Sequence, residues 1–467
     1  MGGQRGERTK ETFPYGWAAG RRGAIKEVLE FLKAIKKIKT GGNSMTKVQK
    51  RNFLLYSTGR LVSLIGSGVQ LIALPLYILD LTGSGTLMGT FTFLSMVPGL
   101  IFSPIAGVLG DRMNRKKIMV NMDYLRGIII LFMAYSAYQG WMNIAFIFTA
   151  QVFISILDSV FGGSTGAMLP DLVPIEFLTK ANSVNSSINS VSNILGPILG
   201  GIIYGFWGIK VVFLINGISF VISAISEMFI TYVPHFEGKQ KISFKSMFSD
   251  IKEGLVFIRG RKGLKELFLF AMIANFIMSP IFMIVFPYVL RQEIGFTSEQ
   301  YGITQSSFTL GILIGSILIG TIFYKSNPKK SMTLGLIAEA IMFFIISTLF
   351  FPHVVTNFGG ASWTLLIILY INLMLIGVCN AFINIPINTN LQKMTPTKVR
   401  SRVFTVLGLI SQGAIPVGSL IFGTLLDLMR GYQLTLFASI ASAIVTILFL
   451  KIAPEETFNP KPVTEEV

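Results

Sequence analysis

Long apolar runs alternate with short polar stretches along nearly the whole chain. Each run is apolar on every side rather than on one face, and each is long enough to cross a membrane as a helix. A backbone in lipid must satisfy its own hydrogen bonds, which a helix does within one segment. The pattern therefore predicts an all-α polytopic membrane protein, whose twelve transmembrane helices lie at about 53–79, 86–109, 118–138, 142–166, 187–208, 211–233, 266–290, 299–324, 331–351, 362–390, 403–427 and 432–452.

Basic residues in the loops indicate the orientation. The loops on the side of the N-terminal segment carry 20 Lys and Arg, whereas the opposite loops carry only Lys210, Arg291 and Arg430. Because loops rich in Lys and Arg stay inside the cell, we expect a multi-pass protein of the plasma membrane with both termini in the cytoplasm. The formal net charge of +17 has the same origin, since these residues face anionic lipid headgroups.

A polar stretch at 234–265 divides the helices into six plus six. We expect an N-terminal six-helix bundle at 53–233 and a C-terminal six-helix bundle at 266–452, joined by that cytoplasmic linker. A cytoplasmic segment at 1–52 precedes the first bundle, and a cytoplasmic tail at 453–467 follows the second.

The first 44 residues allow two interpretations. They hold one amphipathic piece, at 24–39, which is suited to lie on the inner leaflet. Alternatively, 1–44 is an extension upstream of a second start at Met45. The segment has no apolar core of the kind found in a secretory signal. We assign it no function.

The composition excludes several classes of protein. The chain is 52% hydrophobic and 13% charged, with a mean hydropathy of +0.64, whereas soluble domains carry about a quarter charged residues. No soluble segment is large enough to present a basic face for nucleic acid. Cys379 is the only cysteine, and neither His235 nor His353 has ligand spacing around it, so no metal or cofactor is predicted. Without a P-loop or a catalytic domain, the chain is not expected to be an enzyme.

Two segments suggest an internal repeat. VPIEFLTKANSVNSSINSVSNILGPILGG enters the fifth helix, and TPTKVRSRVFTVLGLISQGAIPVGSLIFG enters the eleventh, with prolines at corresponding places. The basic run at 115–117 has a reduced counterpart at 327–330, again between the second and third helices of a half. Two similar halves in parallel orientation are typical of transporters in which one bundle rocks against the other.

A charged motif lies between the second and third helices, in GVLGDRMNRKKIM. It resembles the loop motif that the major facilitator superfamily carries at this place, through Gly107, Leu109, Asp111, Arg112, Arg115, Lys116 and Lys117. The resemblance covers all twelve helices, and LPDLVP at 169–174 and GPILGG at 196–201 are similar to the branch with macrolide-efflux and siderophore-export proteins. Asn114 stands where that motif usually has glycine, and asparagine tolerates the left-handed backbone of a tight turn.

The resemblance implies that this motif is a cytoplasmic gate. In that role Asp111 would pair with cations or a helix N-terminus, and the four basic residues with carboxylates or lipid phosphate. The plainer alternative is that these residues only fix the orientation of the helices. Both interpretations can hold together.

Four charges lie within the first four helices, where a charge costs several kcal/mol unless it is paired or functional. They are Arg60, Asp123, Arg126 and Asp158, all expected in the cytoplasmic half of the membrane. Asp123 and Arg126 are three residues apart and are expected to neutralise each other. Glu227 and Glu339 are on helices that the resemblance places at the periphery.

Asp158 has two alternative roles, because the resemblance places the first and fourth helices along the central cavity. It is either a proton carrier or the permanent ion-pair partner of Arg60. Many proton-coupled exporters of the superfamily carry an arginine in the fourth helix, and this chain has none there. We hypothesise that Arg60 substitutes for it.

Glycine, proline and amide side chains complete the candidate site. The motif of Gly196, Pro197, Gly200 and Gly201 is similar to that of the superfamily's antiporters, and its small residues allow close helix approach. Amides suit a bulky, amphipathic solute held by a few adaptable hydrogen bonds, although some of them join helices instead. The expected pathway residues are Gln70, Gln151, Asn275, Gln305, Asn380, Asn384 and Gln412.

These features together predict a secondary transporter, with a small-molecule substrate, protons and membrane lipids as partners and a monomeric state. The favoured interpretation is a proton-coupled exporter of drug-like or amphipathic molecules. One alternative is export or flipping of a siderophore-like or lipid-like metabolite. Another is a non-transporting scaffold or receptor with the same fold.

Overall fold

The protein is helical throughout the part of the chain that its computed structural model describes, which comprises residues 45–232, 244–324 and 326–460. At 107, 108, 110–112, 167, 244–248, 250, 397, 398, 400 and 401 only the backbone is described. The N-terminal extension with its amphipathic piece lies outside these residues. The elements of the first half are α2 (Lys47–Thr82), α3 (Gly85–Arg112), α4 (Arg115–Gln139), α5 (Ile144–Leu172), η1 (Ile175–Phe177) and α6 (Leu178–Met228).

The second half follows α7 (Phe244–Arg259), a helix within the linker that the sequence did not predict. Its elements are α8 (Lys262–Pro280), η2 (Ile281–Val285), α9 (Phe286–Tyr288), η3 (Val289–Ile294), α10 (Ser298–Thr321), α11 (Pro328–Leu349), α12 (Pro352–Asn357), α13 (Trp363–Met394), α14 (Thr397–Leu428), α15 (Gly431–Ile452) and α16 (Glu455–Phe458).

The prediction of twelve membrane-crossing helices is confirmed. In the described part, 11 helical stretches are long and apolar enough to cross a membrane, and one of them, Ile175–Met228, has 54 residues. That stretch is twice the length of a span of about 20 residues. At Gly208 its backbone leaves the helix, with φ 71° and ψ −177°. Since glycine adopts this conformation without steric cost, α6 turns there and supplies both the fifth and the sixth helix.

The helices extend beyond their apolar cores because polar residues cap them. Thr46 caps α2, Ser84 caps α3 and Asn114 caps α4, each through a side-chain oxygen that accepts a backbone N–H. The left-handed conformation considered for Asn114 is wrong, since its φ is −63° and its ψ 106°. Asn327 caps α11 in the same way, which strengthens the correspondence between the two basic runs.

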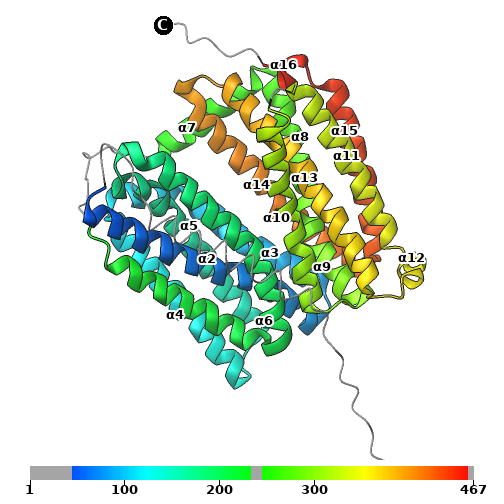
Figure 1. Ribbon diagram of the computed structural model, residues 1–467, viewed down its shortest axis with the longest axis horizontal. Helices are drawn as coiled ribbons and strands as arrows, with labels where there is room; N and C mark the ends of the chain where they lie inside the picture. The colour runs from blue at the N-terminus through cyan, green and yellow to red at the C-terminus, as the bar shows by residue number, and fades with distance from the viewer. Residues whose placement is uncertain (1–44, 233–243, 325, 461–467) are drawn as a thin grey trace, which may run out of the picture.

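The two halves repeat one packing scheme. In the first half α3 packs on α5, and the second part of α6 packs on α4. The equivalent helices of the second half form the equivalent pairs, α10 with α13 and α15 with α11. Figure 1 shows each half as a bundle of its own, so the six-plus-six division is a division in space as well as in sequence.

The halves touch each other through α3 on α14 and α6 on α10. We call the end of the molecule with Met45 and Pro460 the termini end, and the opposite end the distal end. The largest apolar cluster joins both halves, whereas at the termini end one cluster belongs to the second half and another to the first. The halves thus share a core toward the distal end and diverge toward the termini end (Figure 1).

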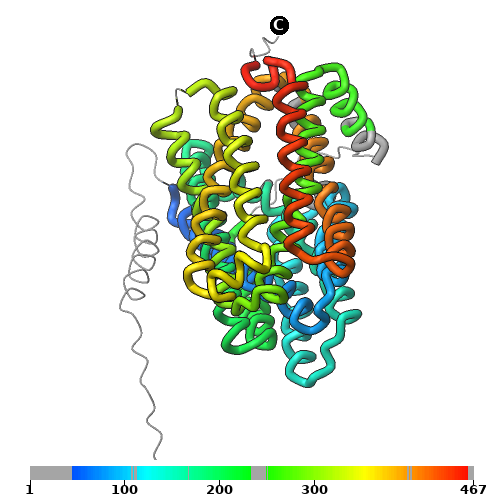
Figure 2. Tube along the Cα trace, turned by 90° about the vertical axis from the view of Figure 1, so that its right-hand side faces the viewer, coloured from blue at the N-terminus to red at the C-terminus, as the bar shows by residue number. Residues whose placement is uncertain are grey.

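The segment after α15 is fastened to the second half rather than free. The buried Asn390 amide donates to the carbonyl oxygens of Thr457 and Phe458 at 3.0 and 2.9 Å. Glu456 accepts a hydrogen bond from the backbone N–H of Gly263 at 2.9 Å. The expected tail therefore begins with α16, which closes the termini end of this bundle (Figure 2).

Candidate functional site

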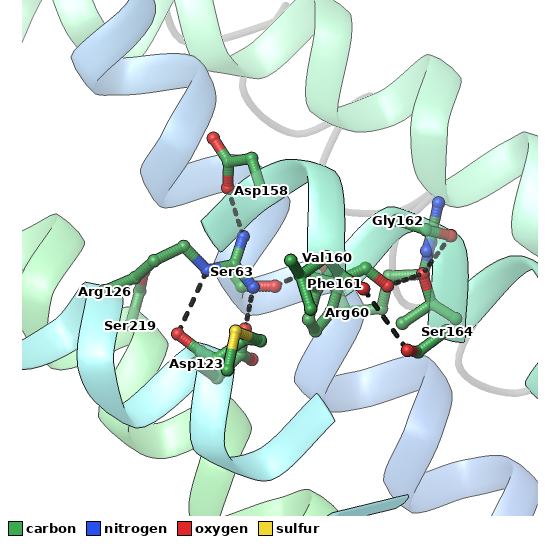
Figure 3. A network of polar contacts seen from close by, with 12 residues as sticks. Arg60, Ser63, Asp123, Arg126, Asp158, Val160, Phe161, Gly162, Ser164 and Ser219 are labelled. Carbon is green, nitrogen blue, oxygen red and sulfur yellow. Dashed lines mark hydrogen bonds and ion pairs between the residues drawn. The ribbon is translucent and has the colours of Figure 1, made fainter. Parts of the chain in front are cut away.

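Arg126 lies at the centre of a charged cluster inside the first half. Its Nη1 donates to Asp158 Oδ1 of α5 at 2.5 Å, and its Nη2 forms an ion pair with Asp123 on its own helix. Figure 3 shows the guanidinium between these two carboxylates. The pairing of Asp123 with Arg126 agrees with the expectation from their spacing. Arg126 also ties α4 to α5, a contact that spacing alone does not reveal.

Aromatic rings hold this guanidinium in a buried position. The Arg126 side chain is 6% exposed, and its Cζ lies 4.1 Å from the ring centroid of Phe161 and 4.5 Å from that of Phe220. Its Nε donates to the Met122 carbonyl oxygen at 3.4 Å. A cation over aromatic faces gains roughly 0.5–2 kcal/mol, and more when it is desolvated. Each nitrogen of the guanidinium is thus hydrogen-bonded, and two aromatic rings pack against it.

Asp158 is the exposed member of the cluster, with a side chain that is 51% exposed. Gly162 and Gly166 follow it on the same side of α5, and a Cβ built on either would meet nothing within 4 Å. Gly162 is nine residues from the exposed Phe153, which places this side of the helix opposite Phe153. Asp158 therefore connects the buried Arg126 to unfilled space along α5.

Arg60 is not the partner of Asp158, which corrects that alternative. Its Nη2 lies 3.5 Å from Asn189 Oδ1 of α6, so it links α2 to α6. Its Nε is buried without a hydrogen-bond partner among the described residues. Arg60 remains near the cluster, because it interacts electrostatically with Glu227.

Glu227 belongs to the cluster. It was not among the candidate site residues predicted from the sequence, because its helix was expected at the periphery. The residue is 1% exposed, and it interacts electrostatically with Asp123, Arg126 and Arg60. It lies near the termini end of α6, on the side that packs on α2 and α4. A charge within a membrane-crossing helix was the sequence signal that could have identified Glu227. The sequence does not show how that helix is rotated, and so does not show that Glu227 faces the cluster. Glu339 is far from this cluster, on α11, where it faces Cys379 of α13.

Two of the expected pathway amides point toward the opposite half. Gln305 comes seven residues after Ser298. Ser298 approaches the first half so closely that a Cβ atom built on Gly201 would lie 2.4 Å from its carbonyl oxygen. Gln412 comes seven residues before Ser419, whose carbonyl oxygen would lie 2.3 Å from a Cβ at Gly89. Seven residues are nearly two turns, so each amide shares a helix face with a residue that contacts the other half.

Three further amides have similar positions. Gln151 shares its side of α5 with Asp158, two turns later. On α13, Asn384 is exposed and donates to Asn380 Oδ1 at 3.0 Å. Both asparagines are on the side opposite the exposed Ile371 and Leu375, each nine residues from one of them. These amides are accessible and directed away from the outer surface of the bundle.

The remaining two amides are bonded within the protein. Gln70 is 7% exposed and accepts from Asn216 Nδ2 at 2.7 Å, so it joins α2 to α6. Its assignment to the pathway is corrected accordingly. Asn275 is half-buried and donates to the Ala271 carbonyl oxygen of its own helix at 2.9 Å.

Two basic residues of the gate motif, Arg115 and Lys116, bind groups of the first half. Arg115 forms an ion pair with Asp171 at 2.9 Å, and Lys116 donates to the Met228 carbonyl oxygen at 2.7 Å. Burial and the hydrogen bond to Asp171 raise the pKa of Tyr232, which shares this carboxylate. Lys117 is exposed. At Gly107, Asp111 and Arg112 only the backbone is described, so the role of the motif as a cytoplasmic gate stays a prediction.

Charged groups that sequence reasoning missed join the halves at the distal end. Asp427 of α14 accepts from the Ser84 hydroxyl at 2.8 Å and from the backbone N–H groups of Gly85 and Thr86 at 2.6 and 3.1 Å. An anion at a helix N-terminus is favourable because unpaired N–H groups point at it. Arg291 forms an ion pair with Asp80 at 2.8 Å.

The glycine-proline motif contributes to the same contact. Cβ atoms built on Gly196 and Gly200 would lie 2.8 and 2.7 Å from backbone atoms of α2, within the first half. Gly201 instead meets Ser298 and Gly302 of the second half, and a Cβ on Gly302 would lie 2.5 Å from the Pro197 carbonyl oxygen. The motif therefore packs α6 closely against both neighbours.

No group of three or more His, Cys, Asp or Glu suited to a metal ion occurs between residues 45 and 232, 244 and 324, or 326 and 460.

A family of transmembrane secretion effectors within the major facilitator superfamily matches residues 44–462. The chain belongs to this family. It is a multi-pass membrane transporter, and its fold is the twelve-helix fold of that superfamily.

Relatives and solved structures agree with this assignment. Macrolide efflux protein A of Streptococcus pyogenes is 27% identical over 382 residues, which cover 81% of this chain and 90% of the relative. The staphyloferrin A transporter of Staphylococcus aureus is more distant, at 21% identity over 82% of this chain and 92% of its own length. The nucleoside transporter NupG has a similar fold, with a TM-score of 0.68 and 14% identity over 86% of this chain and 100% of its own.

Proposed function

We propose that the protein is a proton-coupled exporter of drug-like or amphipathic small molecules. The observation that carries the proposal is the ion pair between Asp158 and Arg126. The carboxylate of Asp158 is exposed, whereas the arginine that it binds is buried. Protonation of Asp158 would weaken that ion pair, so a proton arriving through the open space along α5 changes the contact between α4 and α5. The likeness to macrolide efflux proteins favours export.

Transport would proceed by alternating access between the halves. The Asp427 and Asp80–Arg291 contacts hold the distal end together in the described state. In the opposite state these contacts break, and the gate motif at the start of α4 closes the termini end. A transporter needs two such states within a few kcal/mol of each other.

We place the termini end in the cytoplasm. Lys329, Arg402 and the basic gate motif lie at that end, whereas the distal loops carry few basic residues. The described state is then open to the cytoplasm. Reporter fusions test this placement: a periplasmic-type reporter inserted between 140 and 143 should be active, and the same reporter after residue 460 should be silent. The reverse result would invert the orientation.

The substrate class follows from the polar side chains on the helix faces that are directed toward the space between the two halves. Gln305, Asn384 and Gln412 are neutral hydrogen-bonding groups, and Asp158 supplies a negative charge on the open side of α5. Adaptable amides with one carboxylate suit a bulky, weakly cationic solute better than a phosphate or a polyanion.

Uptake by inverted membrane vesicles tests the proposal. A fluorescent cation of the acridine type and a macrolide should accumulate only when a pH gradient is imposed, and Asp158→Asn should remove the dependence on that gradient. Glu339→Gln, which changes a carboxyl group elsewhere in the membrane-crossing region, is the matched control. Accumulation that is equal with and without the gradient would contradict proton coupling.

A second candidate is export of a siderophore-like metabolite, which the similarity to the staphyloferrin A transporter favours. Failure of cations and macrolides to accumulate, together with release of a carboxylate-rich chelator from cells that express the protein, would favour it. A non-transporting scaffold predicts that Asp158→Asn changes no solute movement at all.

A further inference from the structure

Glu227 is a buried carboxyl group that the proposed function does not use. Its Oε2 and the Oδ2 of Asp123 are both buried without a hydrogen-bond partner among the described residues. Glu227 interacts electrostatically with Asp123, Arg126 and Arg60, and the hydroxyl of Ser223, one turn earlier on α6, is also buried without a hydrogen-bond partner among the described residues. A carboxyl group that is 1% exposed, with an unsatisfied oxygen, is costly to keep as an anion unless it is paired.

Each of the three nitrogens of Arg126 binds a group other than Glu227 in this state. Its Nη1 binds Asp158, its Nη2 binds Asp123, and its Nε binds the Met122 carbonyl oxygen. The rings of Phe161 and Phe220 pack against its guanidinium. No ion pair of Glu227 is present within the described residues.

The charges of the cluster do not balance. Arg60 and Arg126 face three carboxyl groups, those of Asp123, Asp158 and Glu227. The other groups near Glu227 are Tyr56 on α2 and Ser223 on α6, neither of which adds a positive charge. An unpaired charge in a buried site costs several kcal/mol, and a carboxylate avoids that cost by taking up a proton.

We propose that Glu227 holds a proton in this state. The proton removes the unpaired charge from Glu227 and balances the cluster. The role of Glu227 in transport rests on the proposed function. In that function Glu227 would be a buried proton-binding group, and it would pass its proton to Asp158, which exchanges the proton with the pathway.

The two carboxyl groups would exchange one proton for one guanidinium. When the proton moves from Glu227 to Asp158, an O–H bond breaks on Glu227 and forms on Asp158. Nη1 of Arg126 leaves the neutral Asp158 and turns to the ionised Glu227, so the net charge of the cluster stays constant. Asp158, which is exposed, then releases the proton to the pathway.

Infrared difference spectroscopy on the purified full-length protein tests this without any substrate. The carbonyl stretch of a protonated carboxyl group should lose one component in Glu227→Gln and keep that component in the control Glu339→Gln. Asp158→Asn should also lose it, because the freed arm of Arg126 lets Glu227 ionise. In vesicles, Glu227→Gln should lower gradient-driven uptake by about a hundredfold, the size expected when a proton-transfer group is removed.

The outcomes separate this inference from the proposed function. Wild-type protein without the protonated component, or Glu227→Gln that retains it, would overturn the inference whatever the transport result. Persistence of the component in Asp158→Asn would overturn the exchange, and this variant serves even where Glu227→Gln fails to fold. Loss of the component in both variants without transport of any cation or macrolide would support the assignment and contradict only the proposed function.

Discussion

A single guanidinium organises the charges inside the first half. The sequence identifies Arg126 as an intramembrane charge and pairs it correctly with Asp123, because both are on one face of one helix. It does not identify Asp158 or Glu227 as neighbours of Arg126, because those contacts depend on how α5 and α6 are rotated about their axes. Spacing within a helix is readable from a sequence, whereas rotation between helices is set by packing.

At this scale the prediction concerns Arg126→Met. Removing the guanidinium leaves Asp123 buried without an ion-pair partner, and breaking a buried pair from one side costs about 3–5 kcal/mol. We expect a clear fall in the thermal stability of the purified protein, partly restored when Asp123→Leu is added. Arg60→Met, which removes no ion pair present in the described residues, is the control and should have a smaller effect. Equal losses in the two single variants would show that Arg126 is not the centre.

At the scale of helices, close contacts between small residues join the halves. The sequence predicted the twelve helices and the importance of the glycine-proline motif. It could not predict that Gly201 meets Gly302 of α10 whereas Gly196 meets Gly68 of α2, because small residues permit close approach without choosing a partner. The turn at Gly208 was expected only as a loop, since a single residue suffices for it.

The corresponding prediction compares two glycines of α10. A Cβ on Gly302 would lie 2.5 Å from the Pro197 carbonyl oxygen, whereas a Cβ on Gly320 would meet nothing within 4 Å. Gly302→Leu should therefore hold the halves apart at the distal end and reduce uptake strongly, while Gly320→Leu should leave uptake near the wild-type rate. Normal uptake by Gly302→Leu, at equal amounts of protein in the membrane, would contradict the proposed closure.

For the whole molecule, the contacts between the halves define the state. They combine the shared apolar core with the carboxylate of Asp427 at the N-terminus of α3 and the Asp80–Arg291 ion pair. Sequence reasoning missed these charges because they lie at helix ends, where charged residues are common. Nothing in the order of residues indicates that a charge at the end of α14 meets the start of α3.

The prediction at this scale concerns Asp427→Asn. The amide keeps the shape of the side chain but loses the charge that favours the α3 N-terminus, a contribution of about 0.3–2 kcal/mol. The population should shift toward the state that is open at the distal end. Spin labels on the exposed Leu81 and Leu428 should report longer distances in this variant, and Asp171→Asn, at the other end of the molecule, should not lengthen them. Unchanged distances would remove Asp427 from the distal contact.

The most direct test of the central claim is to measure whether protons move in the direction opposite to the substrate. The purified protein is placed in liposomes that enclose a pH indicator, without an imposed gradient, and a transported cation or macrolide is added outside. The account predicts a pH change inside that requires the substrate and is absent in Asp158→Asn. Substrate entry with no accompanying pH change in the wild-type protein would contradict proton-coupled exchange.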